Sequence, residues 1–222
     1  MSSAIATHAR SSAVWWSWVI WWLTLLAIPA SFIGAPYPAE LRLQHLPTLV
    51  GMAAIGWAIW SRFLSWPSLG CIGLFIWLHL IGARWIYSFV PYDDVSTWLF
   101  GISLSDVFGW RRNHYDRLVH FASGVLGVPV VVEVLRFRCR MSVRASHLTA
   151  VAWVLAIGAI YEVAEWALAV VMSPGAAEAY NGQQGDIWDP QKDLALAGLG
   201  AILAVGISHL WPNGWNLSQP RS

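Results

Sequence analysis

The sequence predicts an all-α protein, a polytopic membrane helical bundle of about six transmembrane helices, and three observations support this fold class. First, the 222 residues are 57% hydrophobic and 11% charged, whereas a soluble domain of this length carries about 55 charged residues. Second, several apolar stretches approach the length of about 20 residues that a helix needs to cross a bilayer. Third, the 17 tryptophans suit the two membrane interfaces, where the indole ring is half-buried and its N–H is hydrogen-bonded.

The composition also excludes other classes of protein. A disordered chain needs low hydrophobicity and high charge. A nucleic-acid binder needs a concentrated positive field, whereas 13 basic and 12 acidic residues leave a net charge of +1. Cys71 and Cys139 fall in a predicted span and a predicted loop, so we expect no disulfide. The lipid bilayer is therefore the expected partner, and a small-molecule or lipid substrate is compatible with it.

Six predicted spans form a single integral membrane domain of residues 1–222. In order, they cover residues 13–33, 47–62, 68–90, 118–135, 148–172 and 194–211. The first is secure because no charged residue lies between Arg10 and Glu40. Its length and its tryptophans fit a retained span better than a cleaved signal peptide, which has a short apolar region and a small-residue cleavage site.

Particular residues mark the later segments. Arg62 closes the second span, and its long side chain can reach the membrane surface. Between the third and fourth spans, residues 95–104 are apolar enough to form a short helix along the interface. The sixth span carries small residues that let helices approach closely. These are Ala197, Gly198, Gly200, Ala201 and Ala204.

Basic residues in short loops predict the orientation, because such loops stay in the cytoplasm. The loop after the fourth span holds Arg136, Arg138, Arg140 and Arg144. Counting from this loop places both chain ends, with Arg10 and Arg221, in the cytoplasm. Three arginines disagree, because this count puts them on the outer side. They are Arg111, Arg112 and Arg117.

Ionisable side chains inside a bilayer are costly and usually face the bundle interior, so each is a functional candidate. The predicted topology places most of them in the outer half. Asp116 and His120 lie at the mouth of the fourth span, and their i, i+4 spacing puts them on one helix face. Glu162 and Glu165 share one face of the fifth span in the same way. Three aspartates precede or begin the sixth span, namely Asp186, Asp189 and Asp193.

Four further polar residues are predicted to line the same region. His79 lies near the middle of the third span, Tyr87 follows two helical turns later on the same face, and Arg84 lies between them. Tyr115 directly precedes the mouth of the fourth span. Some of these polar groups also have a simple structural explanation: His79 alone can be a hydrogen-bonded packing residue, and Asp189 can cap a helix.

Two glutamates on one face within the apolar layer repel each other unless a proton or a cation neutralises them. One alternative is structural pairing with an arginine, namely Arg84, Arg111, Arg112 or Arg117. The other is a metal, proton or ligand site. A divalent metal would draw on seven candidate ligands, Asp116, His120, Glu162, Glu165, Asp186, Asp189 and Asp193. Such donors suit magnesium, manganese, calcium, iron or zinc, and seven of them would serve two metals better than one.

Three functions are compatible with this set. In a metal-dependent hydrolase or lipid-modifying enzyme, Asp116, His120 and Arg117 are the candidate catalytic residues. The cation would polarise a phosphoryl or carbonyl oxygen, His120 would move protons, and Arg117 or Arg84 would stabilise negative charge. A proton- or ion-coupled transporter would protonate Glu162 and Glu165 in turn. A structural or assembly protein would use the buried charges only to hold the bundle together.

Three strings of residues occur together in this chain. They are RNHYDRLVHF at 112–121, EVAE at 162–165 and GDIWDPQKD at 185–193. In combination they resemble the YjdF-like family of bacterial inner-membrane proteins, and the resemblance runs from the second span through the sixth. It implies a small multispanning inner-membrane protein. It brings no catalytic roles to these positions.

Overall fold

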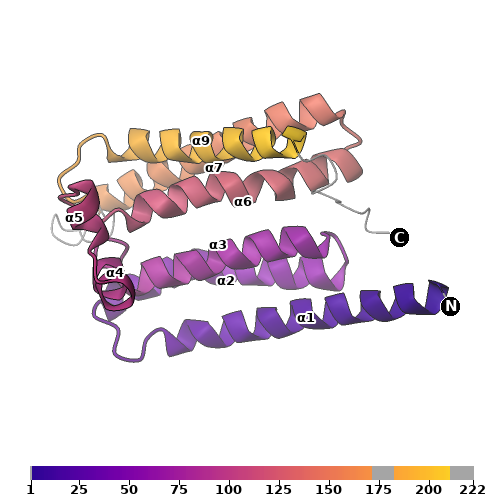
Figure 1. Cartoon of the computed structure of the whole chain (residues 1–222), viewed down its shortest axis with the longest axis horizontal. Helices are drawn as coiled ribbons and strands as arrows, with labels where there is room; N and C mark the ends of the chain where they lie inside the picture. Colours follow the sequence, from indigo (N-terminus) through magenta and orange to yellow (C-terminus); the bar gives the residue numbers. More distant parts are fainter. Residues whose placement is uncertain (1, 172–182, 211–222) are drawn as a thin grey trace.

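The computed structural model describes residues 2–171 and 183–210, and every regular element within them is a helix (Figure 1). The long helices are α1 (Ser2–Ala30), α2 (Pro38–Trp60), α3 (Trp66–Arg84), α6 (Tyr115–Phe137), α7 (Val143–Val171) and α9 (Asp189–Leu210). Two short helices, α4 (Tyr92–Phe100) and α5 (Leu104–Phe108), connect α3 to α6. The all-α prediction is confirmed. The predicted span ends at Met172 and Trp211, and the C-terminal Arg221, lie outside the described residues.

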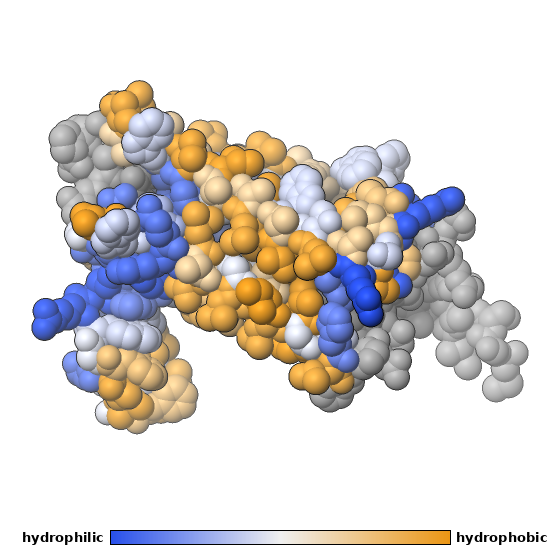
Figure 2. Space-filling view, turned by 90° about the horizontal axis from the view of Figure 1, so that it is seen from above, coloured by the Kyte–Doolittle hydropathy of each residue, from blue (hydrophilic) through white to orange (hydrophobic). Residues whose placement is uncertain are grey.

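Four of the described helices are long and apolar enough to cross a membrane, namely α3, α6, α7 and α9. Helix α1 contains a shorter apolar stretch, Val14–Ala30. Figure 2 shows hydrophobic residues covering the middle of the visible face and hydrophilic residues gathered toward its ends. Such a broad exposed apolar surface is typical of contact with lipid.

The long helices form two groups of three, joined where α3 packs on α6 (Figure 1). Helices α1, α2 and α3 share a core of Ile28, Met52, Ile76 and Leu80. Helices α6, α7 and α9 share a second core, formed by Val128, Val132, Ala150, Val154, Ala197, Ala201 and Ala204. The second group carries most of the residues predicted to be functional.

Two glycines bring the backbones of α6 and α9 into contact. A Cβ atom on Gly124 would lie 2.0 Å from the Ala197 carbonyl oxygen, and one on Gly200 would lie 2.2 Å from the Phe121 carbonyl oxygen. No side chain fits at either position, so this crossing fixes the distance between the two helices. The close approach predicted for the sixth span is found here, and all five of its small residues are buried.

Helix α2 begins at Pro38, earlier than the predicted second span at residue 47. Proline suits the first turn because backbone N–H groups there have no partner within the helix, so the lack of one costs nothing. The negative charge of Glu40 is stabilised by the positive end of the helix dipole. Pro47 consequently lies inside α2. The prediction rested on the length of the apolar stretch, so it did not include this more polar first part of the helix.

Helix α3 ends at Arg84, before the predicted end of the third span at residue 90. Ile86 adopts a left-handed conformation with φ of 44°. The Tyr87 N–H then donates to the Gly82 carbonyl at 2.7 Å, which closes the helix with a Schellman motif. The apolar residues that follow Arg84 belong to this reversal of the chain and to the approach to α4.

A buried carboxylate joins α3 to α6 at the end of the bundle away from α4. Glu133 accepts hydrogen bonds from the Ser65 N–H at 2.6 Å, from the Ser65 hydroxyl at 2.5 Å and from the Ser68 hydroxyl. Ser65 is the N-cap of α3, so the carboxylate also lies at the positive end of that helix dipole.

Candidate functional site

Five candidate residues gather near the α4–α5 end of the second helix group. Helix α7 runs antiparallel to α6 and α9, so its C-terminal part lies beside the first turns of the other two (Figure 1). We call this set the acid–histidine cluster. It consists of Asp116 and His120 from α6, Glu162 and Glu165 from α7, and Asp193 from α9.

Asp116, His120 and Asp193 form the tightest part of the cluster. Each offers one ligand atom, and these atoms all lie within 4.8 Å of one another. The predicted i, i+4 relation on α6 places His120 Nε2 3.6 Å from Asp116 Oδ1. Asp193 is 2% exposed, so the three groups meet inside the bundle.

Helix α7 adds two carboxylates to this group. Glu162 Oε1 lies 3.7 Å from His120 Nε2. Glu165 is hydrogen-bonded to Tyr161. It also interacts electrostatically with Asp116, Glu162 and Asp193. The predicted convergence of α6, α7 and α9 around one imidazole is therefore present in the geometry.

The carboxylates of the cluster lack a full set of partners. Asp193 Oδ1 and Glu162 Oε1 are buried and accept no hydrogen bond from the described residues. Within the part of the chain that the structure describes, the ion pairs of these acids run only to His120. Four carboxylates around one imidazole leave excess negative charge, which protons or cations must offset in an apolar layer.

Beside this cluster lies a second set of charges, which we call the ion-pair cluster: Arg112, Arg117, Asp186, Asp189 and Lys192. Arg112 donates from Nη1 and from Nη2 to the two oxygens of Asp189, the second bond measuring 3.2 Å. Arg117 Nη2 lies 2.7 Å from Asp186 Oδ2 and 2.8 Å from Asp189 Oδ1. The structure thus pairs two of the seven predicted metal ligands, Asp186 and Asp189, with arginines.

Lys192 completes the ion-pair cluster. Its Nζ lies 2.6 Å from Asp186 Oδ2. This hydrogen bond is the main reason why the pKa of Asp186 falls to about 2. Asp186 is therefore ionised at neutral pH and is held by cations of the protein itself.

Arg117 pairs with Asp186 and Asp189, and not with Glu162 or Glu165, within the described residues. Its Nε is buried and has no hydrogen-bond partner among the described residues. Arg117 therefore keeps one buried donor available at the ion-pair cluster. Such an N–H group can donate a hydrogen bond to an anionic oxygen of a ligand.

The remaining predicted lining residues belong mostly to the first helix group. His79 Nε2 lies 2.7 Å from Thr48 Oγ1, and His79 Nδ1 lies 2.5 Å from the Tyr87 hydroxyl. Tyr87 reaches His79 because the chain folds back after α3 and not through helical spacing. Its ring occupies the space at Gly82, where a Cβ atom would lie 2.5 Å from it.

Arg84 and Tyr115 bind backbone carbonyls. Arg84 donates to Ser31, to Ile33 at 2.9 Å and to Gly34 at 3.4 Å, so it satisfies the carbonyls that follow α1. The Tyr115 hydroxyl donates to Leu78 at 3.0 Å and links the two helix groups. Among the described contacts, Arg84 makes no ion pair with the acid–histidine cluster.

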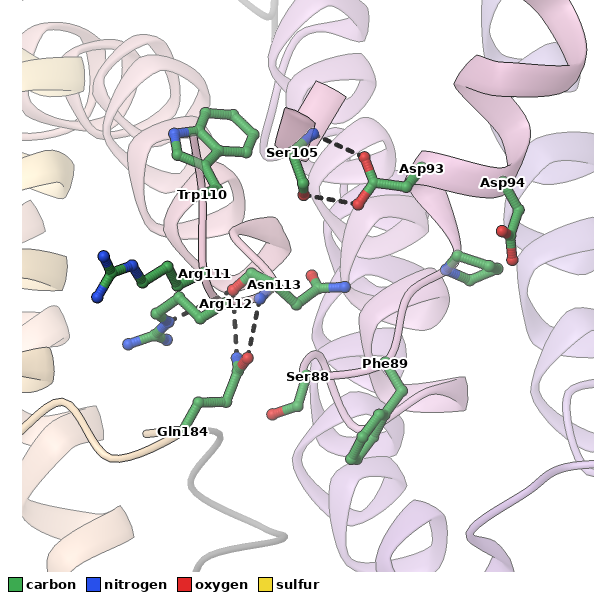
Figure 3. Close-up of a pocket in the computed structure, with 11 residues that line it drawn as sticks. Ser88, Phe89, Asp93, Asp94, Ser105, Trp110, Arg111, Arg112, Asn113 and Gln184 are labelled. Carbon is green, nitrogen blue, oxygen red and sulfur yellow. Dashed lines mark hydrogen bonds between the residues drawn. The ribbon is translucent and has the colours of Figure 1, made fainter. Parts of the chain in front are cut away.

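A surface hollow of about 410 Å³ opens next to Arg112 (Figure 3). Asn113 and Gln184 are among its lining residues and form a reciprocal pair, with N···O distances of 2.9 and 3.2 Å. Burial alone would raise the pKa of Asp93 on its rim, but hydrogen bonds from Ser105 and Ser103 bring that pKa below its usual value. Arg112 of the ion-pair cluster therefore forms part of the wall of this hollow.

A family model described as a predicted membrane protein (DUF2238) matches residues 16–214. The chain belongs to this DUF2238 family. Inner membrane protein YjdF of Escherichia coli (strain K12) is 37% identical over 138 residues, which cover 59% of this chain and 60% of that relative. The DUF2238 chain is an inner-membrane protein, and the resemblance stated from its sequence motifs is confirmed. No solved structure matches it.

Sequence reasoning missed several polar groups that the fold brings together. Ser65 and Ser68 bind Glu133 across more than sixty residues of sequence. His45 lies 2.8 Å from the Ser31 hydroxyl inside the first helix group. The polar residues in the first turns of α2 were the available signal for His45, whereas nothing local to Ser65 indicates its partner.

Proposed function

We propose that the protein is a membrane-embedded, metal-dependent enzyme that binds a divalent cation in the acid–histidine cluster. The observation that carries this proposal is the convergence of Asp116, His120 and Asp193, whose ligand atoms lie within 4.8 Å of one another. Atoms bound to one cation at about 2.1 Å lie about 3.4 Å apart in a tetrahedral site. Small side-chain adjustments would therefore close the site around an ion.

The donor set favours zinc, manganese or iron. Two carboxylates and one imidazole suit these ions, and Glu162 is placed to complete the shell or to take a proton from a bound water. The unpartnered oxygens of Asp193 and Glu162 support this assignment, because each such buried atom costs about 1–3 kcal/mol unless a ligand satisfies it. Because Asp186 and Asp189 are held by arginines, one metal is better supported than two.

The reaction that fits best is hydrolysis of a phosphoryl or carbonyl group on a lipid or other small substrate. A bound cation would supply a Lewis acid and an activated water. Because His120 would bind the cation, Glu162 would hold and move protons within the cluster. The buried Nε of Arg117 would donate to a negatively charged oxygen of the substrate.

The proposed topology has six spans in a single domain of residues 1–222, with both chain ends in the cytoplasm. Helices α1 and α2 run alongside α3 and complete the first helix group (Figure 1). The arginine-rich connection between α6 and α7 lies at the end away from the acid–histidine cluster. The positive-inside rule assigns that end to the cytoplasm, so the cluster would open toward the outer leaflet.

A transporter is the less favoured alternative because of the core of α6, α7 and α9. A path inward from the acid–histidine cluster would have to cross seven apolar residues, Val128, Val132, Ala150, Val154, Ala197, Ala201 and Ala204. A purely structural role is also less favoured, because it leaves the buried oxygens of Asp193 and Glu162 without partners.

Metal analysis of tag-free protein purified without chelator tests the proposal. We expect about one equivalent of divalent metal per chain, and its loss in Asp116→Asn, His120→Ala and Asp193→Asn. Asp106→Asn is the matched control, because Asp106 is an exposed acid of α5. A wild-type protein that contains no metal and does not bind added Zn²⁺ or Mn²⁺ would exclude this function.

A further inference from the structure

Two histidines face each other at the end of the second helix group that is remote from the acid–histidine cluster. His147 lies near the start of α7 and His209 near the end of α9. Their ring centroids are 5.0 Å apart, and the ring planes meet at 55°. Neither residue takes part in the function proposed above.

Hydrogen bonds define which nitrogen of each neutral ring carries the proton. The Ser208 hydroxyl donates to the Val205 carbonyl at 2.7 Å, so its oxygen accepts from His147 Nε2, which is 3.4 Å away. His209 Nδ1 lies 2.8 Å from the same carbonyl, which can only accept. The lone pairs are therefore on His147 Nδ1 and His209 Nε2.

The lone pair of His147 is buried without a described partner. His147 is 9% exposed, and its Nδ1 has no hydrogen-bond donor among the described residues. An acceptor in this position needs either a donor or a metal ion. His209 is exposed, so it provides a route by which an ion could enter.

Both rings also show the supporting contacts typical of metal ligands. A histidine that binds a metal usually donates its other N–H to a protein oxygen, which orients the ring. The Ser208 hydroxyl oxygen accepts from the His147 ring, and the Val205 carbonyl accepts from the His209 ring. With metal–nitrogen bonds of about 2.1 Å, two rings at a tetrahedral angle have centroids about 5 Å apart, which matches the observed separation.

We propose that His147 and His209 bind one transition-metal ion, Zn²⁺, Ni²⁺ or Cu²⁺, in a site separate from the acid–histidine cluster. Neutral imidazoles are the ligands that these ions prefer among nitrogen and oxygen donors. Two protein ligands leave the remaining positions to water, and the positive charge of Arg136 acts on His147. We therefore expect weaker binding than in a structural zinc site with four protein ligands.

The test uses tag-free, full-length protein in detergent, with Cu²⁺ followed by electron paramagnetic resonance and Ni²⁺ and Zn²⁺ followed by calorimetry. A His120→Ala background removes the only imidazole of the acid–histidine cluster. We expect it to retain one Cu²⁺ site with two nitrogen ligands. His209→Ala should weaken binding at least tenfold, Ser208→Ala should weaken it by about 10-fold, and His114→Ala, in the loop before α6, is the matched control.

Two results would overturn the inference. One is that none of the three metals binds to the wild-type protein. The other is that binding survives His209→Ala but is lost in His120→Ala, which would assign the ion to the acid–histidine cluster. If His147→Ala does not fold, the variants of the exposed His209 still test the proposal. Protection of His209 from diethylpyrocarbonate by the metal provides a second measurement on the wild type.

Discussion

Glu133 and Asp193 are both buried carboxylates, and they lie at opposite ends of the bundle in opposite surroundings. Glu133 is 1% exposed and accepts three hydrogen bonds from Ser65 and Ser68. Asp193 is 2% exposed, yet one of its oxygens has no partner in the described part of the chain. Burial is therefore the same for the carboxylate that joins two helices and for the one that we propose binds a metal. The two differ in the number of hydrogen-bond donors around them.

The largest expected effect is on metal binding. Asp193→Asn should reduce the metal affinity at least 100-fold, because it replaces a carboxylate that binds the cation directly with a neutral amide. Glu133→Gln should leave the metal content unchanged, since Glu133 lies away from the acid–histidine cluster. Elemental analysis and calorimetry of the two purified variants measure this difference, and equal metal loss in both would remove the distinction between the two carboxylates.

The effect on stability should run in the opposite direction. Glu133→Ala leaves the Ser65 N–H and two hydroxyls without their acceptor, so it should lower the free energy of unfolding by about 3–5 kcal/mol. Asp193→Ala should cost about 1 kcal/mol or less in metal-free protein, because it removes an unsatisfied charge. Denaturant titration in mixed micelles compares them. A larger loss for the Asp193 variant would contradict the assignment of a binding role.

The close contact between α6 and α9 at Gly200 offers a way to displace Asp193 without affecting Glu133. Gly200→Ala places a Cβ atom 2.2 Å from the Phe121 carbonyl, so α9 must move away from α6 at a cost of about 1–3 kcal/mol. Asp193 would then separate from Asp116 and His120, and metal affinity should fall. Gly206→Ala is the control, because nothing lies within 4 Å of the added atom. Unchanged metal binding in Gly200→Ala would show that the crossing does not set the site.

Asp186 adds a third kind of carboxylate and the smallest effect. Lys192 lowers its pKa to about 2 from an ordinary value of 3.8. Between these values the folded state binds fewer protons than the unfolded state, so the stabilisation is complete above about pH 4 and is lost as the pH falls toward 2. Asp186→Asn should flatten this part of a profile of melting temperature against pH. An Asp94→Asn control should keep the wild-type slope, and a wild-type slope in the Asp186 variant as well would refute the ion pair's contribution.

The sequence predicts the helical class well because apolar length is a local property. It predicts helix ends less well. The end of α3 at Arg84 depends on the left-handed Ile86 and on the bond from Tyr87 to Gly82, in a stretch that remains apolar. The start of α2 at Pro38 depends on a first turn that is more polar than the rest of the helix.

In the candidate site too, contacts within one helix could be predicted from the sequence, and contacts between distant segments could not. The pairing of Asp116 with His120 follows from one turn of a helix, and the sequence indicates it directly. The choice of partners for Asp189 depends on how the segment before α9 meets Arg112. The meeting of His147 with His209 depends on the antiparallel packing of α7 and α9. Charge pairing between distant segments has no signature within a single segment.

The apolar core between the two ends of α6, α7 and α9 has an electrical consequence. None of its seven residues can ionise or carry water inward. In the proposed orientation, most of the membrane voltage would therefore drop across this layer and the part of the bundle toward the cytoplasm. An ion held by Asp116 and Asp193 would stay near the potential of the outer compartment, and its occupancy would follow the concentration there and not the energised state of the membrane.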